Sequence, residues 1–142
     1  MLFKAYDEHF KSIIFIKMKP AFFLDRDGVI NIDKGYVYTE DNFEWIQDAK
    51  NAIKLIKNNG YYVFVITNQS GISRGYYTED HVNALHEFIQ KKLNDNNTEV
   101  DEFFYSPYHP DSDTKLYDHL KDLRKPNTGM LNLAFKKWKI IK

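Results

Sequence analysis

The stretch that decides the fold is Ala21-Phe22-Phe23-Leu24-Asp25-Arg26-Asp27-Gly28. Four apolar residues end abruptly in two carboxylates and a glycine, which is typical of a buried strand that runs into a loop. Residues 61–66 form a second run, rich in β-branched and aromatic side chains, and it ends in Thr67-Asn68-Gln69-Ser70-Gly71. Both predicted strands therefore deliver polar side chains to a loop at their carboxyl ends.

Helical patterns separate and follow these strands. The predicted order is strand, helix, strand, helix, strand, loop and helix, over residues 21–24, 46–56, 61–66, 78–93, 100–105, 106–129 and 130–138. This alternation predicts an α/β fold, a three-layer α/β/α Rossmann-like parallel sheet whose ligands bind beyond the carboxyl ends of the strands. Residues 31–45 show no sustained period, and we interpret them as a flap-like loop over that site.

The composition is that of one globular domain. At 142 residues and 43% apolar content, the chain has room for a single proper core. Acidic and basic residues balance at 20 each, so no net field attracts nucleic acid or an anionic membrane. The absence of cysteine excludes disulfides and thiolate zinc sites, which fits a cytoplasmic enzyme.

The amino-terminal segment gives no sign of export. Its longest apolar run, residues 13–16, is far too short for a signal-peptide core or a membrane span. Because Met18 comes just before the first convincing strand, we expect residues 1–17 to be an N-terminal extension and residues 18–142 to be the domain. The sequence leaves open whether the extension is a leader, a short helix or the product of an upstream start.

Asp25 and Asp27 are the first candidates for chemistry. Two carboxylates on one loop can share a divalent cation and a reacting phosphorus centre, although an arbitrary Asp-x-Asp is more often a pair of solvated turn residues. At the second strand end, the Thr67 hydroxyl and the following amides suit an oxyanion, with simple helix capping as the alternative. Arg124 and Lys125 supply a bidentate donor and a compact positive charge, or else a basic surface pair.

Arginine is scarce in this chain. Only three of the 20 basic residues are arginines, namely Arg26, Arg74 and Arg124, and each lies in a turn-like segment that contains glycine or proline. A planar fork of donors in such a segment can grip phosphate in a way that lysine cannot.

Three segments resemble the signatures of the haloacid dehalogenase superfamily of phosphatases. They are residues 23–31 (Phe-Leu-Asp-Arg-Asp-Gly-Val-Ile-Asn), residues 67–71 and Arg124-Lys125-Pro126. The resemblance implies that Asp25 attacks phosphorus to form an aspartyl-phosphate, while Asp27 protonates the leaving group and later activates water. It also implies that Thr67 holds phosphate oxygens and that Lys125, beside Arg124, offsets negative charge. The implied cofactor is Mg²⁺, bound by Asp25 and by the backbone carbonyl of Asp27.

Within the superfamily, residues 31–37 and 67–75 look most like the heptose bisphosphate phosphatases. By that likeness the substrate contacts are Asp33, Lys34, Gly35, Tyr36, Asn68, Gln69, Ser70, Arg124 and Lys125. The implied reaction removes the 7-phosphate of D-glycero-D-manno-heptose 1,7-bisphosphate in the cytoplasm, on the route to lipopolysaccharide or other surface-sugar precursors. The implied partner is this small phosphorylated sugar, with no nucleic acid and no membrane.

Two departures from the family pattern stand out. We expect no structural zinc, because the positions of the family's four zinc ligands hold Ser106, Tyr108, Lys121 and Leu123. The fourth family signature, a Gly-Asp pair that supplies another Mg²⁺ carboxylate, would lie beyond Lys142. We therefore expect a domain truncated before this motif, with weaker Mg²⁺ binding at this length.

The outer edge of the first strand is a further expectation. The strand that lies beside it in the family would also follow Lys142, which leaves Phe22 to Leu24 at an uncovered edge. Exposed apolar edges invite association. We expect a monomer for the full-length form and edge-mediated association for this chain.

Several alternatives stay open at this stage. The substrate could be histidinol phosphate or another small phosphate ester, and the chain could instead be a catalytically impaired fragment that still binds phosphate. A receiver-like signalling domain that accepts phosphate on Asp25 is disfavoured by the Arg-Lys-Pro segment. The histidines receive no role, since His81 and His86 are expected to lie off the core stripe of their helix.

Overall fold

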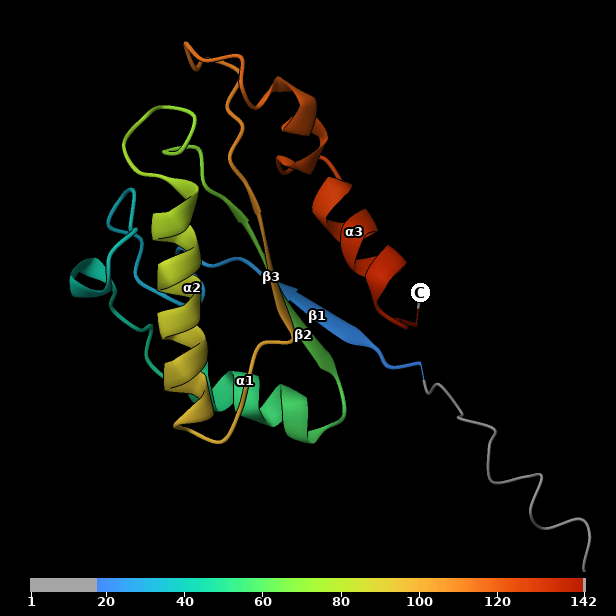
Figure 1. Cartoon of the computed structure of the whole chain (residues 1–142). Coiled ribbons are helices and arrows are strands. Elements are labelled where there is room, and N and C mark those ends of the chain that lie inside the picture. The colour runs from blue at the N-terminus through green and yellow to red at the C-terminus, as the bar shows by residue number, and fades with distance from the viewer. Residues whose placement is uncertain (1–17, 142) are drawn as a thin grey trace, which may run out of the picture.

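The computed structural model describes residues 18–141, so the expected N-terminal extension lies outside the described residues. The strands β1 (Ala21–Leu24), β2 (Tyr62–Asn68) and β3 (Glu102–Ser106) form a parallel sheet in the order β1-β2-β3 (Figure 1). Leu24 pairs with Val65, so the carboxyl ends of β1 and β2 lie at the same edge of the sheet. The predicted parallel α/β architecture is confirmed.

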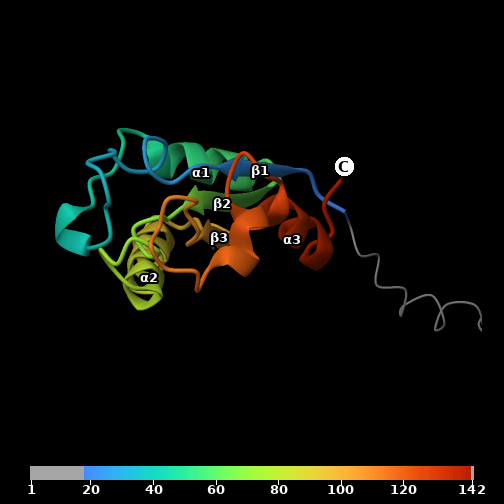
Figure 2. The same cartoon turned by 90° about the horizontal axis from the view of Figure 1, so that it is seen from above.

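Helices cover both faces of this sheet (Figure 2). They are α1 (Ala49–Asn58), α2 (Glu79–Asn94) and α3 (Gly129–Lys137), with short 3₁₀ helices η2 (Glu40–Asn42) and η3 (Asp118–Leu123). The side-chain alternation of β2 explains the layers. Val63 and Val65 enter the core that α1 and α2 cover, whereas Phe64 between them enters the core that α3 covers. Within residues 18–141, no helix is both long and apolar enough to cross a membrane.

The start of α2 follows from its first four residues. The Thr78 side chain accepts a hydrogen bond from the backbone N–H of His81, and the His81 ring accepts the backbone N–H of Thr78 at 3.1 Å. This reciprocal capping satisfies two donors that a helix start leaves without partners. Glu79 and Asp80 add negative charge to the first turn, which the helix dipole favours.

His86 corrects one expectation about α2. Its side chain is only 6% exposed and stacks on the ring of Phe103 with the ring centroids 4.5 Å apart. The prediction that His86 lies off the buried face is wrong, because it stands four residues after Val82 and three before Ile89, both of which are fully buried. Burial lowers the pKa of His86 to about 3, and the positive charge of Arg26 acts in the same direction.

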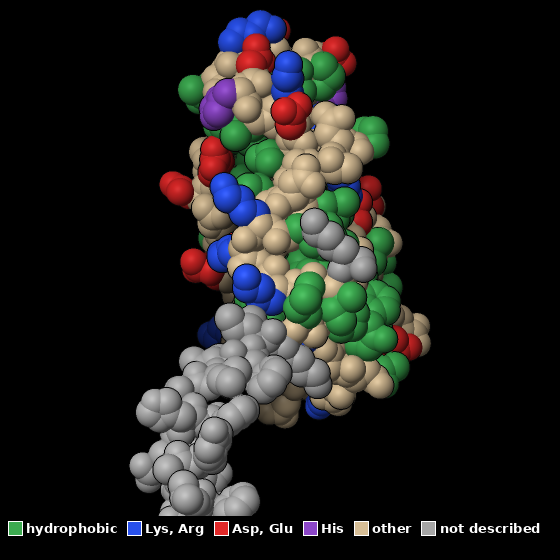
Figure 3. Space-filling model, turned by 90° about the vertical axis from the view of Figure 1, so that its right-hand side faces the viewer, with side chains coloured by type: hydrophobic (Ala, Val, Ile, Leu, Met, Phe, Trp, Pro, Cys, Tyr) green, Lys and Arg blue, Asp and Glu red, His purple; other side chains and the backbone are tan. Residues whose placement is uncertain are grey.

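The edge of the sheet at β1 is covered only at its start. Lys19 pairs in parallel with Ile140, and the backbone N–H of Ile141 donates to the carbonyl of Lys19 at 3.0 Å. Beyond this pair, β1 has no second neighbour among the described residues, and the Phe22 side chain is 43% exposed. Figure 3, which views the molecule from its α3 side, shows hydrophobic side chains gathered in a patch. The expected open edge is thus present from Phe22 to Leu24.

Candidate active site

A cavity of about 310 Å³ opens beyond the carboxyl ends of β1 and β2. Its lining residues are Asp25, Asp27, Asp33, Gly35, Tyr36, Thr67, Asn68, Gln69, Ser70, Tyr77 and Lys125. Of the residues that the sequence predicts for the site, only Lys34 and Arg124 do not line this cavity. The parallel sheet is the reason for the convergence, because it brings the loops after β1 and β2 to one edge.

Asp25 comes directly after β1, and its carboxylate pairs with the side-chain ammonium of Lys125. One carboxylate oxygen, Oδ1, accepts the backbone N–H of Arg26 at 2.8 Å, and Oδ2 accepts a hydrogen bond from Nζ of Lys125. The Asp25 side chain is 41% exposed and that of Lys125 is 26% exposed, so both are accessible from the cavity. The pair therefore combines an accessible carboxylate with a positive charge that can also meet a phosphate.

The side chain of Asn68 holds the backbone of Lys125 through two hydrogen bonds. Its amide Nδ2 donates to the carbonyl oxygen of Lys125 at 3.2 Å, and its Oδ1 accepts the backbone N–H of Lys125 at 2.9 Å. These two bonds join the end of β2 to the segment before α3. The Asn68 side chain, which the resemblance assigns to the substrate, is therefore engaged with the Lys125 backbone in this structure.

Asp27 is surrounded by hydrogen-bond donors. Oδ1 accepts from Asn31 Nδ2 at 3.0 Å, Oδ2 accepts from Gln69 Nε2 at 3.0 Å, and Arg26 Nη2 lies 3.0 Å from each oxygen. Arg26 is fully buried and also donates to the carbonyl oxygen of Val37. The idea that Arg26 grips phosphate is thus not supported, since its guanidinium serves Asp27 and the flap.

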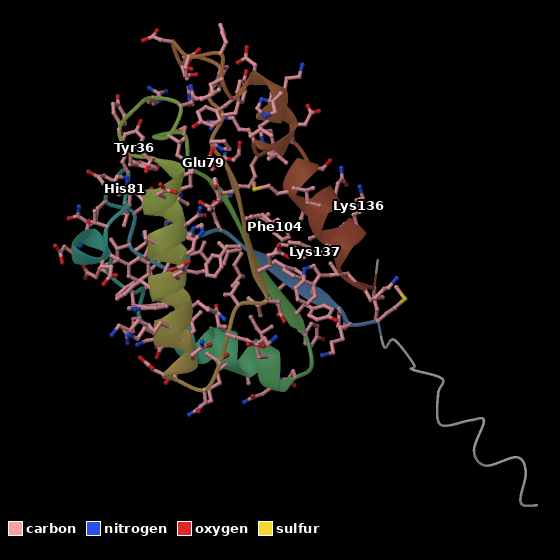
Figure 4. All side chains as sticks on the ribbon, in the orientation of Figure 1. Tyr36, Glu79, His81, Phe104, Lys136 and Lys137 are labelled. Atoms are coloured by element: carbon pink, nitrogen blue, oxygen red, sulfur yellow. The ribbon has the colours of Figure 1, made fainter. Side chains whose placement is uncertain are left out.

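The flap forms one wall of the cavity. Asp33 Oδ1 accepts the backbone N–H of Gly35 at 2.9 Å, and Gly35 and Tyr36 both have left-handed backbone angles, with φ of 70° and 51°. Tyr36 is 46% exposed and lies near the amino-terminal end of α2, which carries Glu79 (Figure 4). Lys34 instead pairs with Glu44 at 2.8 Å, outside the cavity.

Arg124 turns toward the loop after β3. Its Nη1 donates to the carbonyl oxygen of Tyr108 at 3.2 Å. Arg74 is also near this loop, with Nη2 3.0 Å from Nε2 of His109. The positive charges of Arg74 and Arg124, together with desolvation as the largest cause, lower the pKa of His109. The side chains of both arginines thus contact the loop after β3 and do not line the cavity.

The residues of the cavity can hold Mg²⁺ in the way the resemblance implies. Mg²⁺ in proteins commonly takes one or two carboxylates, with water and substrate phosphate completing its shell. The Asp25 side chain is 41% exposed and accepts a hydrogen bond from one side chain, whereas the Asp27 carboxylate is 22% exposed and accepts from the side chains of Arg26, Asn31 and Gln69. Asp27 can therefore contribute its backbone carbonyl more readily than its side chain.

Two of the four positions at which the family pattern has zinc ligands are occupied by packed side chains in this chain. Ser106 is fully buried at the end of β3, and Leu123 packs against the core beneath α3. In the part of the chain that the structure describes, no three His, Cys, Asp or Glu side chains are grouped so that they could hold a metal ion. The loop that follows β3 is connected to the rest of the domain by this packing and by the hydrogen bond from Arg124 to Tyr108.

Sequence reasoning missed two residues of the site. Asn31 donates to Asp27, and Tyr77 lines the cavity and donates to Gln69. Asn31 closes the first signature segment, so its position offered a signal. Tyr77 offered none, because it precedes α2 among several other tyrosines and its contact with Gln69 depends on how the loop folds back.

Comparison with known proteins places the chain in a family. Residues 20–141 match the model of the family described as polynucleotide kinase 3 phosphatase. The chain is 44% identical over 115 residues to the D-glycero-beta-D-manno-heptose-1,7-bisphosphate 7-phosphatase of Escherichia coli K12, an alignment that covers 81% of this chain and 60% of that protein. The enzyme of the same description from Rhodopseudomonas palustris is 40% identical over 122 residues, which cover 86% of this chain and 68% of that protein.

Solved structures agree with this likeness. A HAD-like phosphatase from Mesorhizobium loti superposes with a TM-score of 0.79 at 35% identity, covering 87% of this chain and 59% of that one. The D,D-heptose 1,7-bisphosphate phosphatase of B. bronchiseptica, solved with magnesium and phosphate, superposes with a TM-score of 0.71 at 31% identity. This match covers 84% of this chain and 63% of that one. The chain thus spans about 60% of the length of the first relatives it matches. Its likeness to haloacid dehalogenase-like phosphatases is the one that its three signature segments predicted. The chain belongs to the family described as polynucleotide kinase 3 phosphatase.

Proposed function

We propose that this protein is a Mg²⁺-dependent phosphomonoesterase, with residues 18–142 as its phosphatase domain. The observation that carries the proposal is the convergence of Asp25, Asp27, Thr67 and Lys125 on one cavity. These four groups supply what phosphoryl transfer requires, namely a nucleophile, an acid and base, a hydroxyl donor and a positive charge. Membership of a phosphatase family supports the same reaction class.

The proposed reaction has two steps. First, a carboxylate oxygen of Asp25 forms a bond to phosphorus, the bond from phosphorus to the ester oxygen breaks, and Asp27 gives a proton to the departing oxygen. Asp27 then takes a proton from water, whose oxygen forms a bond to phosphorus. The bond from phosphorus to the Asp25 oxygen breaks, which releases phosphate and restores the Asp25 carboxylate. Lys125 and the Thr67 hydroxyl stabilise the negative charge on the phosphoryl oxygens. Mg²⁺, when held by Asp25 and the Asp27 carbonyl, offsets the repulsion between nucleophile and phosphate.

We infer that the substrate is a small sugar bisphosphate, with the 7-phosphate of D-glycero-β-D-manno-heptose 1,7-bisphosphate as the group removed. The likeness to 7-phosphatases at 40–44% identity supports this choice. The size of the cavity, about 310 Å³, and its wall of Asp33, Gly35 and Tyr36 suit a polyhydroxylated ligand. Balanced charge gives no support for a polynucleotide substrate.

Phosphate release from a panel of substrates tests the proposal. The panel contains heptose 1,7-bisphosphate, histidinol phosphate and a 3′-phosphorylated oligonucleotide, each with and without Mg²⁺. We expect Mg²⁺-dependent release that is fastest with the heptose bisphosphate, and a loss of at least about 10³-fold in Asp25→Asn, because the nucleophile is removed. Asp113→Asn, at an exposed loop acid, is the matched control and should retain activity.

Two outcomes would count against this function. Equal phosphate release by Asp25→Asn and the unchanged protein would exclude Asp25 as nucleophile. No release from any substrate, together with calorimetric binding of inorganic phosphate, would favour a phosphate-binding protein without turnover.

A further inference from the structure

A buried chain of hydrogen bonds lies behind the cavity. The Tyr77 hydroxyl donates to Oε1 of Gln69 at 2.8 Å. Nε2 of the same Gln69 side chain donates to Asp27 Oδ2 at 3.0 Å and to Thr67 Oγ1 at 2.9 Å. Gln69, Thr67 and Tyr77 are 2%, 1% and 5% exposed. Both polar atoms of the Gln69 side chain are thus engaged in hydrogen bonds inside the protein.

The position of Tyr77 is fixed by close packing. Its ring stacks on Tyr38 with the centroids 4.7 Å apart. A Cβ at Gly71 would lie 2.1 Å from the Tyr77 ring, so glycine at this position is what lets the ring approach the loop. Burial, the largest cause, raises the pKa of Tyr77 to about 12. The hydroxyl therefore keeps its proton near neutral pH and can donate a hydrogen bond.

Asp27 and Tyr77 together fix the orientation of the Gln69 amide, because the carboxylate can only accept a hydrogen bond and the tyrosine hydroxyl donates one to the amide oxygen. The Gln69 oxygen accepts the Tyr77 hydroxyl, and the nitrogen consequently faces Asp27 and Thr67. In the opposite orientation, the amide oxygen would stand about as close to the Asp27 carboxylate as the nitrogen does now, and two acceptors would repel each other. The carboxylate thus excludes that alternative, and the hydrogen bond from Tyr77 holds the amide oxygen in place on the opposite side.

The orientation of the amide matters for two groups of the proposed mechanism. Because Gln69 donates to the oxygen of Thr67, the proton of the Thr67 hydroxyl is directed elsewhere and can be given to a phosphoryl oxygen. Because the same nitrogen donates to Asp27 Oδ2, that carboxylate is held at a fixed place beside the cavity. We propose that Tyr77 and Gln69 are a pair of positioning residues that align the acid–base carboxylate of Asp27 with the phosphate-binding hydroxyl of Thr67, an inference that rests on the proposed function.

Tyr77→Phe tests this inference, with Tyr38→Phe as the matched control. Both variants delete one phenol oxygen from the same pair of stacked rings, but only Tyr77 donates to Gln69. We expect Tyr77→Phe to lower kcat about tenfold with KM changed less than about twofold, since acid–base alignment contributes to the chemical step and not to binding. Gln69→Met, which keeps the length of the side chain and removes its donor, should lower kcat at least as much. Tyr38→Phe should resemble the unchanged protein.

The side-chain amide signals of Gln69 provide a second measurement that needs no turnover. In the unchanged protein and in Tyr38→Phe, we expect both amide protons to exchange slowly with solvent and to have distinct chemical shifts in ¹⁵N spectra. In Tyr77→Phe, we expect faster exchange and shifted signals, because the amide is no longer held in one orientation.

The two measurements separate this inference from the proposed function. If the unchanged protein releases no phosphate, the proposed function fails, and the amide signals alone decide whether Tyr77 holds Gln69. A tenfold rise in KM with unchanged kcat in Tyr77→Phe would overturn the positioning role, because it would assign the pair to binding. Amide signals that are the same in Tyr77→Phe and Tyr38→Phe would overturn it as well.

Discussion

At the scale of single residues, the two carboxylates of the site, Asp25 and Asp27, each pair with a different basic side chain. Lys125 contacts Asp25 directly, and its backbone is held by Asn68 on a different element. Asp27 has no such cation in the cavity and instead meets the buried guanidinium of Arg26 from behind. The positive charge that faces the cavity is thus that of Lys125, while Arg26 keeps the first loop in shape.

Lys125→Met should remove the charge without disturbing the fold. The Asp25–Lys125 pair is partly exposed, and pairs of this kind contribute no more than about 1 kcal/mol to stability. We expect kcat for phosphate release to fall about 10²-fold or more, because the charge acts on the transition state. Lys136→Met on α3 is a suitable control, since Figure 4 shows this side chain on the outer side of α3.

The comparison is made by measuring phosphate release and thermal unfolding for both variants. Similar unfolding temperatures with a large difference in kcat would support the role of Lys125. An activity of Lys125→Met within about twofold of that of Lys136→Met would contradict it.

At the scale of elements, α2 combines an ordinary helix start with an unusual buried face. Thr78 and His81 cap its first turn reciprocally, and the apolar face packs on β2. His86 lies on the same face, against Phe103 of β3, and its Nε2 has no hydrogen-bond partner among the described residues. A buried imidazole without a partner for a second proton is stable only in its neutral form.

His86 should make the stability of the domain depend on pH. The pKa of His86 is about 3 in the folded protein and near 6.5 in the unfolded chain, so between these values only the unfolded chain binds the proton. The free energy of unfolding therefore falls as the pH falls through this window, by about 2 kcal/mol between pH 7 and pH 5 from this group alone.

Urea unfolding of His86→Met at pH 7 and pH 5 measures this contribution. The variant should lose less stability than the unchanged protein over this interval, whereas His119→Gln, at an exposed histidine, should lose as much as the unchanged protein. Equal losses in all three proteins would mean that His86 accepts a proton without unfolding.

At the scale of the whole molecule, the sheet formed by the described residues has an open edge at β1 that carries apolar side chains. β1 pairs with β2 along its length, and on its other side the one pairing within residues 18–141 is that of Lys19, just before β1, with Ile140. Phe22 and Ile141 are 43% and 52% exposed. An open strand with apolar side chains is a template for pairing with another chain.

We expect the chain to associate in a concentration-dependent way through this edge. Phe22→Lys should reduce the association, because a lysine on an edge strand opposes pairing with a second strand. Leu55→Lys is the matched control, since Leu55 is 65% exposed and belongs to the helix α1 rather than to the edge strand. Sedimentation velocity at several concentrations measures the effect, and a monomer at every concentration in all three proteins would exclude this association.

Much of the fold was predictable because it follows from local patterns. The apolar run before Asp25 and the run before Thr67 identified two strands, and helical spacing identified the three helices, within a few residues of their observed ends. The structure begins α1 at Ala49 rather than at Ile46 and extends β2 to Asn68, since strand pairing and capping decide such ends. Parallel alternation then implied that Asp25 and Thr67 would meet at one edge.

The sequence by itself determined which segments form strands and helices, and which polar side chains reach the carboxyl edge of the sheet, because both depend on periodicity and on chain direction. Only the tertiary structure decided the partners of those side chains. It engages Gln69 with Tyr77 and Asp27, assigns Asn68 to the backbone of Lys125, and leaves Arg124 outside the cavity. The physical reason is that a hydrogen bond between distant residues depends on distances and directions of a few tenths of an ångström, which no local pattern of residues encodes.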